Sequence, residues 1–181
     1  YGGATEDLIS IQYVEDGHQK IVERVCAEVI YGGSRVEIGG GRVRGDGSVG
    51  AWAIDALRNY GVAFHRKYGS VDLSDGYRED RATRYGYQGI PDSIEGEIAA
   101  FKLVEFTQPR TPEELWKGLG LRNPSVICGS ISRPMKRSPG GWCYKTGREW
   151  AHAQRQRGRC TVKGGKKAII YSNTWGDYLG D

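Results

Sequence analysis

The chain has 181 residues, a formal net charge of +4, 38% apolar residues and 28 glycines. This length is enough for one well-buried core, which we expect to be arranged in two lobes. Glycine at about twice its usual frequency argues against a helical bundle and favours a loop-rich fold with many tight turns. Because no apolar run is long enough to span a bilayer, we expect no membrane partner.

The charge is distributed unevenly along the chain. Residues 1–109 contain 12 Lys and Arg against 17 Asp and Glu, whereas residues 110–181 contain 14 against 5. A basic second half is typical of proteins that contact nucleic acid or another anionic partner. The alternative is that these Lys and Arg side chains only keep exposed hairpins hydrated.

The first elements that the sequence predicts are helical. Residues 4–14 read as a helix, and apolar residues at helical spacing predict a second helix over residues 18–30, with Cys26 in its middle. The glycines of residues 31–41 predict a loop. This loop lacks the Gly-Lys-Ser/Thr ending of a phosphate-binding loop, so it gives no nucleotide site.

The middle of the chain predicts short helices separated by polar stretches. Ser48 is the expected N-cap of a third helix that Gly61 ends. Residues 68–89 read as a surface excursion with one short helix near residues 78–85, and Pro91 opens another. Residues 102–106 predict a strand.

A capping box at Thr111-Pro112-Glu113-Glu114 then starts a helix that we expect to end near residue 118. Beyond it the periodicity becomes that of strands, expected at residues 126–128, 150–154, 160–162 and 168–172, with a turn at residues 164–165. Helices followed by an antiparallel sheet predict an α+β fold, with a helical lobe over about residues 1–118 and a β lobe over about residues 119–181.

The cysteines and histidines give no metal-binding pattern. Cys26, Cys128, Cys143 and Cys160 form no CxxC, and no Cys/His spacing suits zinc. We therefore expect free, mostly buried thiols, with no metal and no cofactor. His18 and His65 have no partner pattern and are expected on the surface or on a helix.

One pair of motifs carries chemistry. His152 lies in Trp150-Ala151-His152-Ala153, and the last predicted strand leads into Asn173-Thr174-Trp175-Gly176. A histidine and an asparagine on neighbouring strands form two members of a Cys-His-Asn triad, in which the imidazole takes the thiol proton and the amide fixes the ring tautomer. Trp175, followed by Gly176, would shield that hydrogen bond from water.

This arrangement resembles the papain-like cysteine peptidases. Residues 34–37 and 45–53 also look like papain-fold proteins of tailed phages and some environmental bacteria. The resemblance implies a single papain-like domain over residues 1–181, as a fragment of a longer chain, with peptidase or amidase activity on a protein or peptide. It also implies other virion subunits as partners, and a location in the virion or the host cytoplasm.

Three positions are open for the nucleophile. The first is a cysteine upstream of Tyr1, at the start of the helix that residues 4–14 would continue. The second is Ala51, since residues 47–53 echo the segment around the family's catalytic cysteine with alanine in place of sulfur. The third is Cys26, although its place in an apolar helical pattern is typical of an inert core thiol.

Two other functions compete with the enzyme. The chain could be a structural virion protein that keeps the fold without the chemistry. It could also contact nucleic acid, because Arg155, Arg157 and Arg159 alternate on a predicted strand and would share one face. No recognised nucleic-acid-binding module accompanies them, which makes this the weaker alternative.

Overall fold

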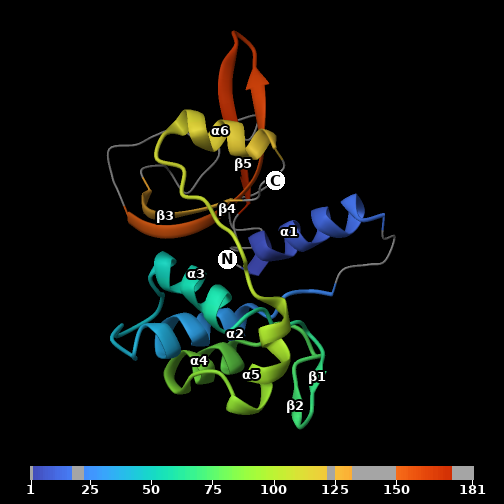
Figure 1. Cartoon of the computed structure of the whole chain (residues 1–181). Coiled ribbons are helices and arrows are strands. Elements are labelled where there is room, and N and C mark those ends of the chain that lie inside the picture. The colour runs from blue at the N-terminus through green and yellow to red at the C-terminus, as the bar shows by residue number, and fades with distance from the viewer. Residues whose placement is uncertain (1, 18–22, 122–124, 132–149, 173–181) are drawn as a thin grey trace. The chain divides into compact units, whose positions relative to one another are not determined.

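The computed structural model describes residues 2–17, 23–121, 125–131 and 150–172 (Figure 1). The chain forms two compact units, Tyr1–Pro109 and Arg110–Asp181, which we call the helical unit and the sheet unit. Mixed helices and antiparallel sheets confirm the α+β class. In the described part of the chain, no helix has the length and apolar character needed to cross a bilayer.

The helical unit begins with the expected helix, α1 (Gly2–Glu15), but the second helix differs from the prediction. Residues 18–22 lie outside the described residues, and the chain is extended up to Cys26. Only then does α2 (Ala27–Gly32) begin. A bridge between Val25 and Phe64 holds this segment in an extended conformation. The backbone pairing there outweighs the helical propensity of the segment.

The glycine-rich segment after α2 is helical, which contradicts the predicted loop. The π-helical segment η1 (Gly33–Ile38) continues α2 directly. The glycines serve packing: a Cβ atom added at Gly32 would lie 2.9 Å from the Cβ atom of Tyr85. Small residues therefore let α2 approach α4, a role that sequence alone does not distinguish from loop formation.

The third helix, α3 (Gly50–Asn59), forms where the sequence predicts it, with a different start. Its N-cap is Val49, whose side chain makes no capping bond, and the hydroxyl of Ser48 instead lies against that of Ser34. Gly61 follows the helix with φ of 108°, and a Cβ atom there would lie 2.1 Å from the carbonyl oxygen of Ile98. Only glycine fits this position.

The segment expected as a surface excursion contributes to the core instead. A short hairpin of β1 (Lys67–Tyr68) and β2 (Val71–Asp72) buries Tyr68, and Leu73 after it is fully buried. The expected short helices are present as α4 (Glu79–Gln88) and α5 (Asp92–Ile98).

The strand expected over residues 102–106 does not form. A short 3-10 turn, η2 (Ala99–Phe101), is followed by extended chain. Leu103 donates its backbone N–H to the carbonyl of Leu57 at the end of α3 rather than to a neighbouring strand. Among the described residues no strand pairs with this segment, so it stays outside both sheets.

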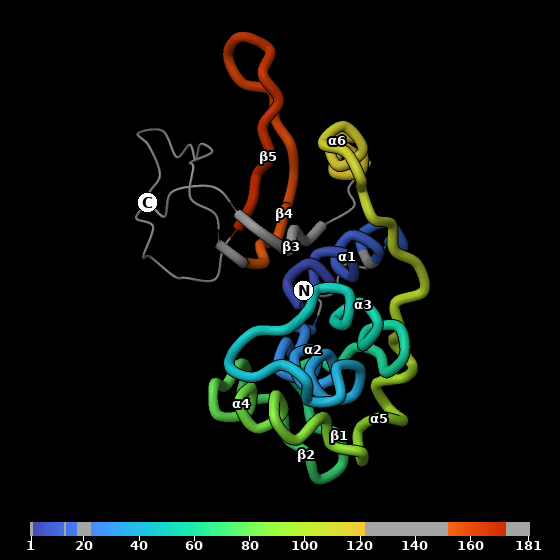
Figure 2. The backbone as a smooth tube through the Cα atoms, turned by 90° about the vertical axis from the view of Figure 1, so that its left-hand side faces the viewer, coloured from blue at the N-terminus to red at the C-terminus, as the bar shows by residue number. Residues whose placement is uncertain are grey.

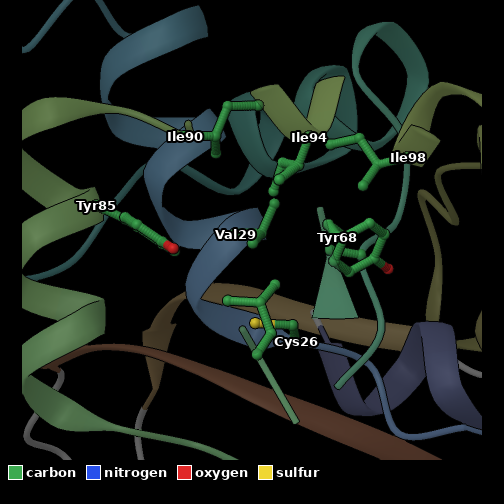
Figure 3. Close-up of a cluster of buried hydrophobic side chains, with 9 residues drawn as sticks. Cys26, Val29, Tyr68, Tyr85, Ile90, Ile94 and Ile98 are labelled. Atoms are coloured by element: carbon green, nitrogen blue, oxygen red, sulfur yellow. The ribbon is translucent and has the colours of Figure 1, made fainter. Parts of the chain in front are cut away.

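Two clusters of buried side chains fill the helical unit. The larger cluster gathers residues from the start of α2, the β1–β2 hairpin, α4 and α5 (Figure 3). Cys26 belongs to this cluster, with its sulfur among the labelled aliphatic and aromatic side chains. The smaller cluster joins Val25 and Ile30 to α3 and to the segment around Phe64. The extended segment 24–26 thus contributes one residue to each cluster.

The sheet unit begins with α6 (Pro112–Gly120), which has the predicted capping box. Thr111 Oγ1 accepts a hydrogen bond from the backbone N–H of Glu114 at 3.1 Å. The helix is followed by an antiparallel sheet of β3 (Ser125–Ile131), β4 (Trp150–Val162) and β5 (Lys166–Ser172), in the order β3-β4-β5. The two strands expected at 150–154 and 160–162 are therefore one strand, and Figure 2 shows β4 and β5 running side by side.

A β-bulge at Arg157 divides β4 into two arms, which we call the inner arm (residues 150–156) and the outer arm (residues 158–162). Gln156 pairs with Tyr171 and Gly158 with Ile170, so Arg157 is the extra residue. Arg155 pairs with Ser172, whereas Arg159 pairs with Ile169. Because Ser172 and Ile169 are three residues apart, they face opposite sides of the sheet, and so do Arg155 and Arg159. The prediction of a single arginine face was wrong, because the bulge reverses the alternation.

Helix α6 packs along the outer arm of β4 through charged and aromatic groups. The guanidinium of Arg159 lies 5.0 Å from the ring centroid of Trp116 and donates to the Trp116 carbonyl oxygen at 3.0 Å. Lys167 also lies over this ring, and its Nζ atom donates to Glu113 Oε2 at 2.5 Å. Some of the basic residues of the second half therefore hold the unit together.

Candidate functional site

His152 lies on the inner arm of β4, where the resemblance requires a strand. Its backbone is in register with Gly129 of β3, and its side chain is half-buried. Gln154 and Gln156 occupy the same face of this arm and are both buried. A half-buried side chain on a paired strand has a fixed backbone and remains partly accessible to solvent.

Strand β5 runs antiparallel to β4 and ends beside the inner arm. Ser172, its last residue, is in register with Arg155 and accepts a 3.1 Å hydrogen bond from Arg155 Nε on its Oγ atom. The described part of β5 therefore ends at a position paired three residues from His152 along β4. Asn173, Trp175 and Gly176 follow immediately in the sequence and lie outside the described residues.

Ala51 lies in the first turn of α3 and is exposed. A helix start is where a catalytic thiol would gain from the helix dipole. The alanine methyl group has no such chemistry. As it stands, this position offers the location of a nucleophile without the reactive atom.

Cys26 is the N-cap residue of α2, not a mid-helix residue as predicted. Its side chain is fully buried, and its thiol donates to Glu28 Oε2 at 3.3 Å. Burial, together with the negative charge of Glu28, raises the pKa of Cys26 to about 12. A thiol that stays protonated is a poor nucleophile, so this environment disfavours the Cys26 alternative.

Glu28 belongs to a buried ion pair. Its Oε1 atom accepts hydrogen bonds from Arg81 Nη2 at 2.7 Å, from Arg81 Nε at 3.1 Å and from the backbone N–H of Arg78 at 2.9 Å. Burial by itself would raise the pKa of Glu28, but these donors lower it below its usual value. Arg81 also pairs with Asp75 at 2.6 Å. The carboxylate is thus ionised and fixed, with Oε2 directed to the thiol.

His65 lies beside this buried pair; it is not on a helix, and it is partly exposed, in keeping with the predicted surface alternative. Its Nδ1 atom lies 2.9 Å from the carbonyl oxygen of Leu73, and its side chain is half-buried. One possible ligand atom each from Cys26, Glu28 and His65 lies within 4.8 Å of the others. Sequence spacing cannot reveal this cluster, since 37 positions separate Glu28 from His65.

Backbone pairing explains why these residues meet. Cys26 donates its N–H to the Ala63 carbonyl at 2.8 Å, and His65 donates its N–H to the Arg24 carbonyl at 2.8 Å. In such an antiparallel pairing around the Val25–Phe64 bridge, Cys26 and His65 are diagonal neighbours on the same face. The β-prone run from Val62 to His65 was the only local signal of this pairing.

Two further cysteines lie on strands of the sheet unit within the described residues. Cys160 is free and half-buried in the outer arm of β4. Cys128 is in β3, in register with Ala153. Cys143 lies outside the described residues.

Comparisons of the chain with protein-family models, with curated proteins and with solved structures found no match.

Proposed function

We propose that the chain belongs to a papain-like cysteine peptidase or amidase domain in which His152 is the general base. The observation that carries this proposal is the course of β5. Its last residue, Ser172, pairs with Arg155 of β4, three positions from His152, and Asn173 is the next residue in the sequence. A histidine and an asparagine brought together from neighbouring strands suit a Cys-His-Asn triad.

In this mechanism His152 accepts the proton of a cysteine thiol and later returns it to the leaving amine. Asn173 orients the imidazole, and Trp175 shields that contact. The thiol comes from a cysteine ahead of α1, because the described alternatives are an alanine at position 51 and a protonated thiol at Cys26. The substrate is a protein or peptide, and the resemblance to phage proteins suggests a virion component.

The test is labelling with a thiol-reactive peptidase probe, applied to the protein as its source makes it. Its N-terminus is determined first, and the labelled peptide is identified by mass spectrometry. We expect one cysteine preceding residue 1 to be labelled, and the labelling to be lost in His152→Ala. Arg157→Gln, an exposed change on the same strand, should label normally. Labelling that persists in His152→Ala would overturn the proposal.

A second candidate is a structural protein that keeps this fold without activity. The exposed Ala51 at the start of α3 favours it, since this position echoes the family's catalytic cysteine. The same experiment separates the candidates. If the native protein has no cysteine ahead of α1 and no thiol reacts in a His152-dependent way, the structural role is the better account.

A further inference from the structure

We propose that Cys26, Glu28 and His65 bind a single zinc ion inside the helical unit. This inference is independent of the proposed peptidase site, and it concerns residues that the expected chemistry leaves without a role. It rests on the geometry of three ligand side chains drawn from two segments that the fold pairs.

The three side chains offer the donor set that zinc prefers: a thiol sulfur, a carboxylate oxygen and an imidazole nitrogen. In a tetrahedral zinc site with bonds of about 2.0–2.3 Å, neighbouring ligand atoms are separated by about 3.5 Å. Cys26 Sγ and Glu28 Oε2 are already 3.3 Å apart, and the whole set lies within 4.8 Å. Small side-chain adjustments therefore suffice to close the site.

Two of the three ligands have a second contact that leaves a donor atom for the metal. His65 uses Nδ1 toward the Leu73 carbonyl, which fixes the ring, so the proposal assigns coordination to Nε2. Glu28 uses Oε1 for Arg81 and the Arg78 backbone, so Oε2 contacts only the thiol among the bonds described. Metal-binding histidines and carboxylates are commonly oriented in this way.

The net charge around the cluster is compatible with a bound cation, although Arg81 is part of the network. The ion-pair network contains Glu28, Asp75 and Asp80 against Arg78 and Arg81, which leaves one net negative charge. When zinc binds, the S–H bond breaks, a sulfur–zinc bond forms and the proton leaves to solvent. No redox change occurs, and the network gains one positive charge overall, which brings it to neutrality.

Three protein ligands leave a fourth position for water. His65 is half-buried whereas Cys26 and Glu28 are buried, so the ion and its water would enter from the side of His65. The ion would join the N-terminus of α2 to the segment before β1. It would therefore stabilise the pairing of residues 24–26 with residues 63–65.

The test uses the whole chain, with a non-thiol reductant present, titrated with Zn²⁺ and separately with Co²⁺ as a spectroscopic probe. We expect Co²⁺ to give a thiolate-to-metal charge-transfer band. Zn²⁺ at 100 times its Kd should raise the Tm by roughly 5–10 °C. Both effects should be absent in Cys26→Ser and retained in Cys160→Ser, in which the other described free thiol is removed.

His65→Gln is the second variant, because its half-buried site tolerates a polar replacement. Its Zn²⁺ affinity should fall by more than the roughly 10- to 100-fold that losing a supporting contact costs. Circular dichroism without metal shows whether each variant is folded. An unchanged wild-type Tm, or the same rise in folded Cys26→Ser or His65→Gln, would refute the zinc site. Probe labelling at the peptidase site gives a separate readout, so either proposal can fail alone.

Discussion

Arg81 Nη2 lies 2.7 Å from Glu28 Oε1, and both side chains are almost fully buried. The pair joins α4 to the first turn of α2, which together account for much of the larger core cluster. Each buried charge is stabilised by its partner, because water cannot hydrate either of them in the folded chain. This contact is therefore the most sensitive polar point of the helical unit.

We expect Arg81→Leu to lower the free energy of unfolding by about 3–5 kcal/mol, since it leaves the Glu28 carboxylate buried and unpaired. Urea denaturation followed by circular dichroism measures the loss. Arg78→Leu is the matched control, because Arg78 pairs with Asp75 and Asp80 at the surface and its loss should matter much less. Equal losses in both variants would contradict the assigned burial.

The buried thiol makes stability depend on alkaline pH. The pKa of Cys26 is raised to about 12 in the folded chain and is about 9 when exposed. Between these values the unfolded chain has lost the proton and the native chain keeps it, so unfolding releases a proton and the free energy of unfolding falls as pH rises.

Relative to Cys26→Ser, the wild type should lose about 1.4 kcal/mol of stability for each pH unit above 9. Urea midpoints measured at pH 8 and at pH 10, with a chelator present, test this difference. Taking the difference from the variant removes the contributions of lysines and tyrosines, which titrate in both proteins. A difference that does not change with pH would mean that the thiol is not held protonated.

Arg35 is a buried cation bound to backbone carbonyls. Its guanidinium donates to the carbonyls of Gly86, Gly45, Gly47 and Val43 at 2.6–3.1 Å, and lies 5.2–5.3 Å from the rings of Tyr31 and Tyr87. We expect Arg35→Lys to cost roughly 3 kcal/mol, because an ammonium cannot reproduce this planar set of bonds.

Hydrogen exchange by mass spectrometry should also show faster exchange in residues 43–47 of the Arg35→Lys variant. Arg42→Lys is the control, since Arg42 is exposed and makes one carbonyl bond beside its contact with Trp52. Its cost should stay near the roughly 0.5–1 kcal/mol of an exposed cation–π contact. Unchanged exchange in Arg35→Lys would show that the arginine does not hold this loop.

Two glycines of the helical unit should respond in opposite directions to alanine. Gly61→Ala should destabilise by roughly 2–4 kcal/mol, because φ is 108° and the new methyl group would meet the Ile98 carbonyl. Gly96→Ala should stabilise by about 0.5–1 kcal/mol, because this glycine is inside α5 and no atom lies within 4 Å of its added Cβ. Thermal melts of the two variants measure both shifts, and a shared sign would contradict the geometry.

Local patterns in the sequence predicted α3, α4 and α6 well, because each has a periodic apolar face or a cap, and α1 also formed where it was predicted. They failed where a long-range contact decides the conformation. Segment 24–26 is extended because it pairs with residues 63–65, and Gly32 is part of a helix because Tyr85 of α4 packs closely against it. Neither packing partner lies within the short stretch of sequence over which apolar periodicity is read.

The candidate site shows the same division. The sequence predicted a strand at His152, and the described pairing places this residue on β4, whereas its catalytic role stays a prediction. The cluster of Cys26, Glu28 and His65 was missed because two of its members appeared helical and the third isolated. Ligand spacing identifies a site only when adjacent positions supply the ligands, whereas here a backbone bridge between distant segments brings them together.

The bulge at Arg157 gives the sheet unit one position of spare length. Because Arg157 is the extra residue of the pairing, deleting it would leave every pair between β4 and β5 in place and make β4 a regular strand. Arg159 would keep its pair with Ile169 and its contact with Trp116, and His152 would keep its pair with Gly129. A second one-residue deletion has no extra residue to remove, so it would shift the register and exchange the two faces of one part of the strand.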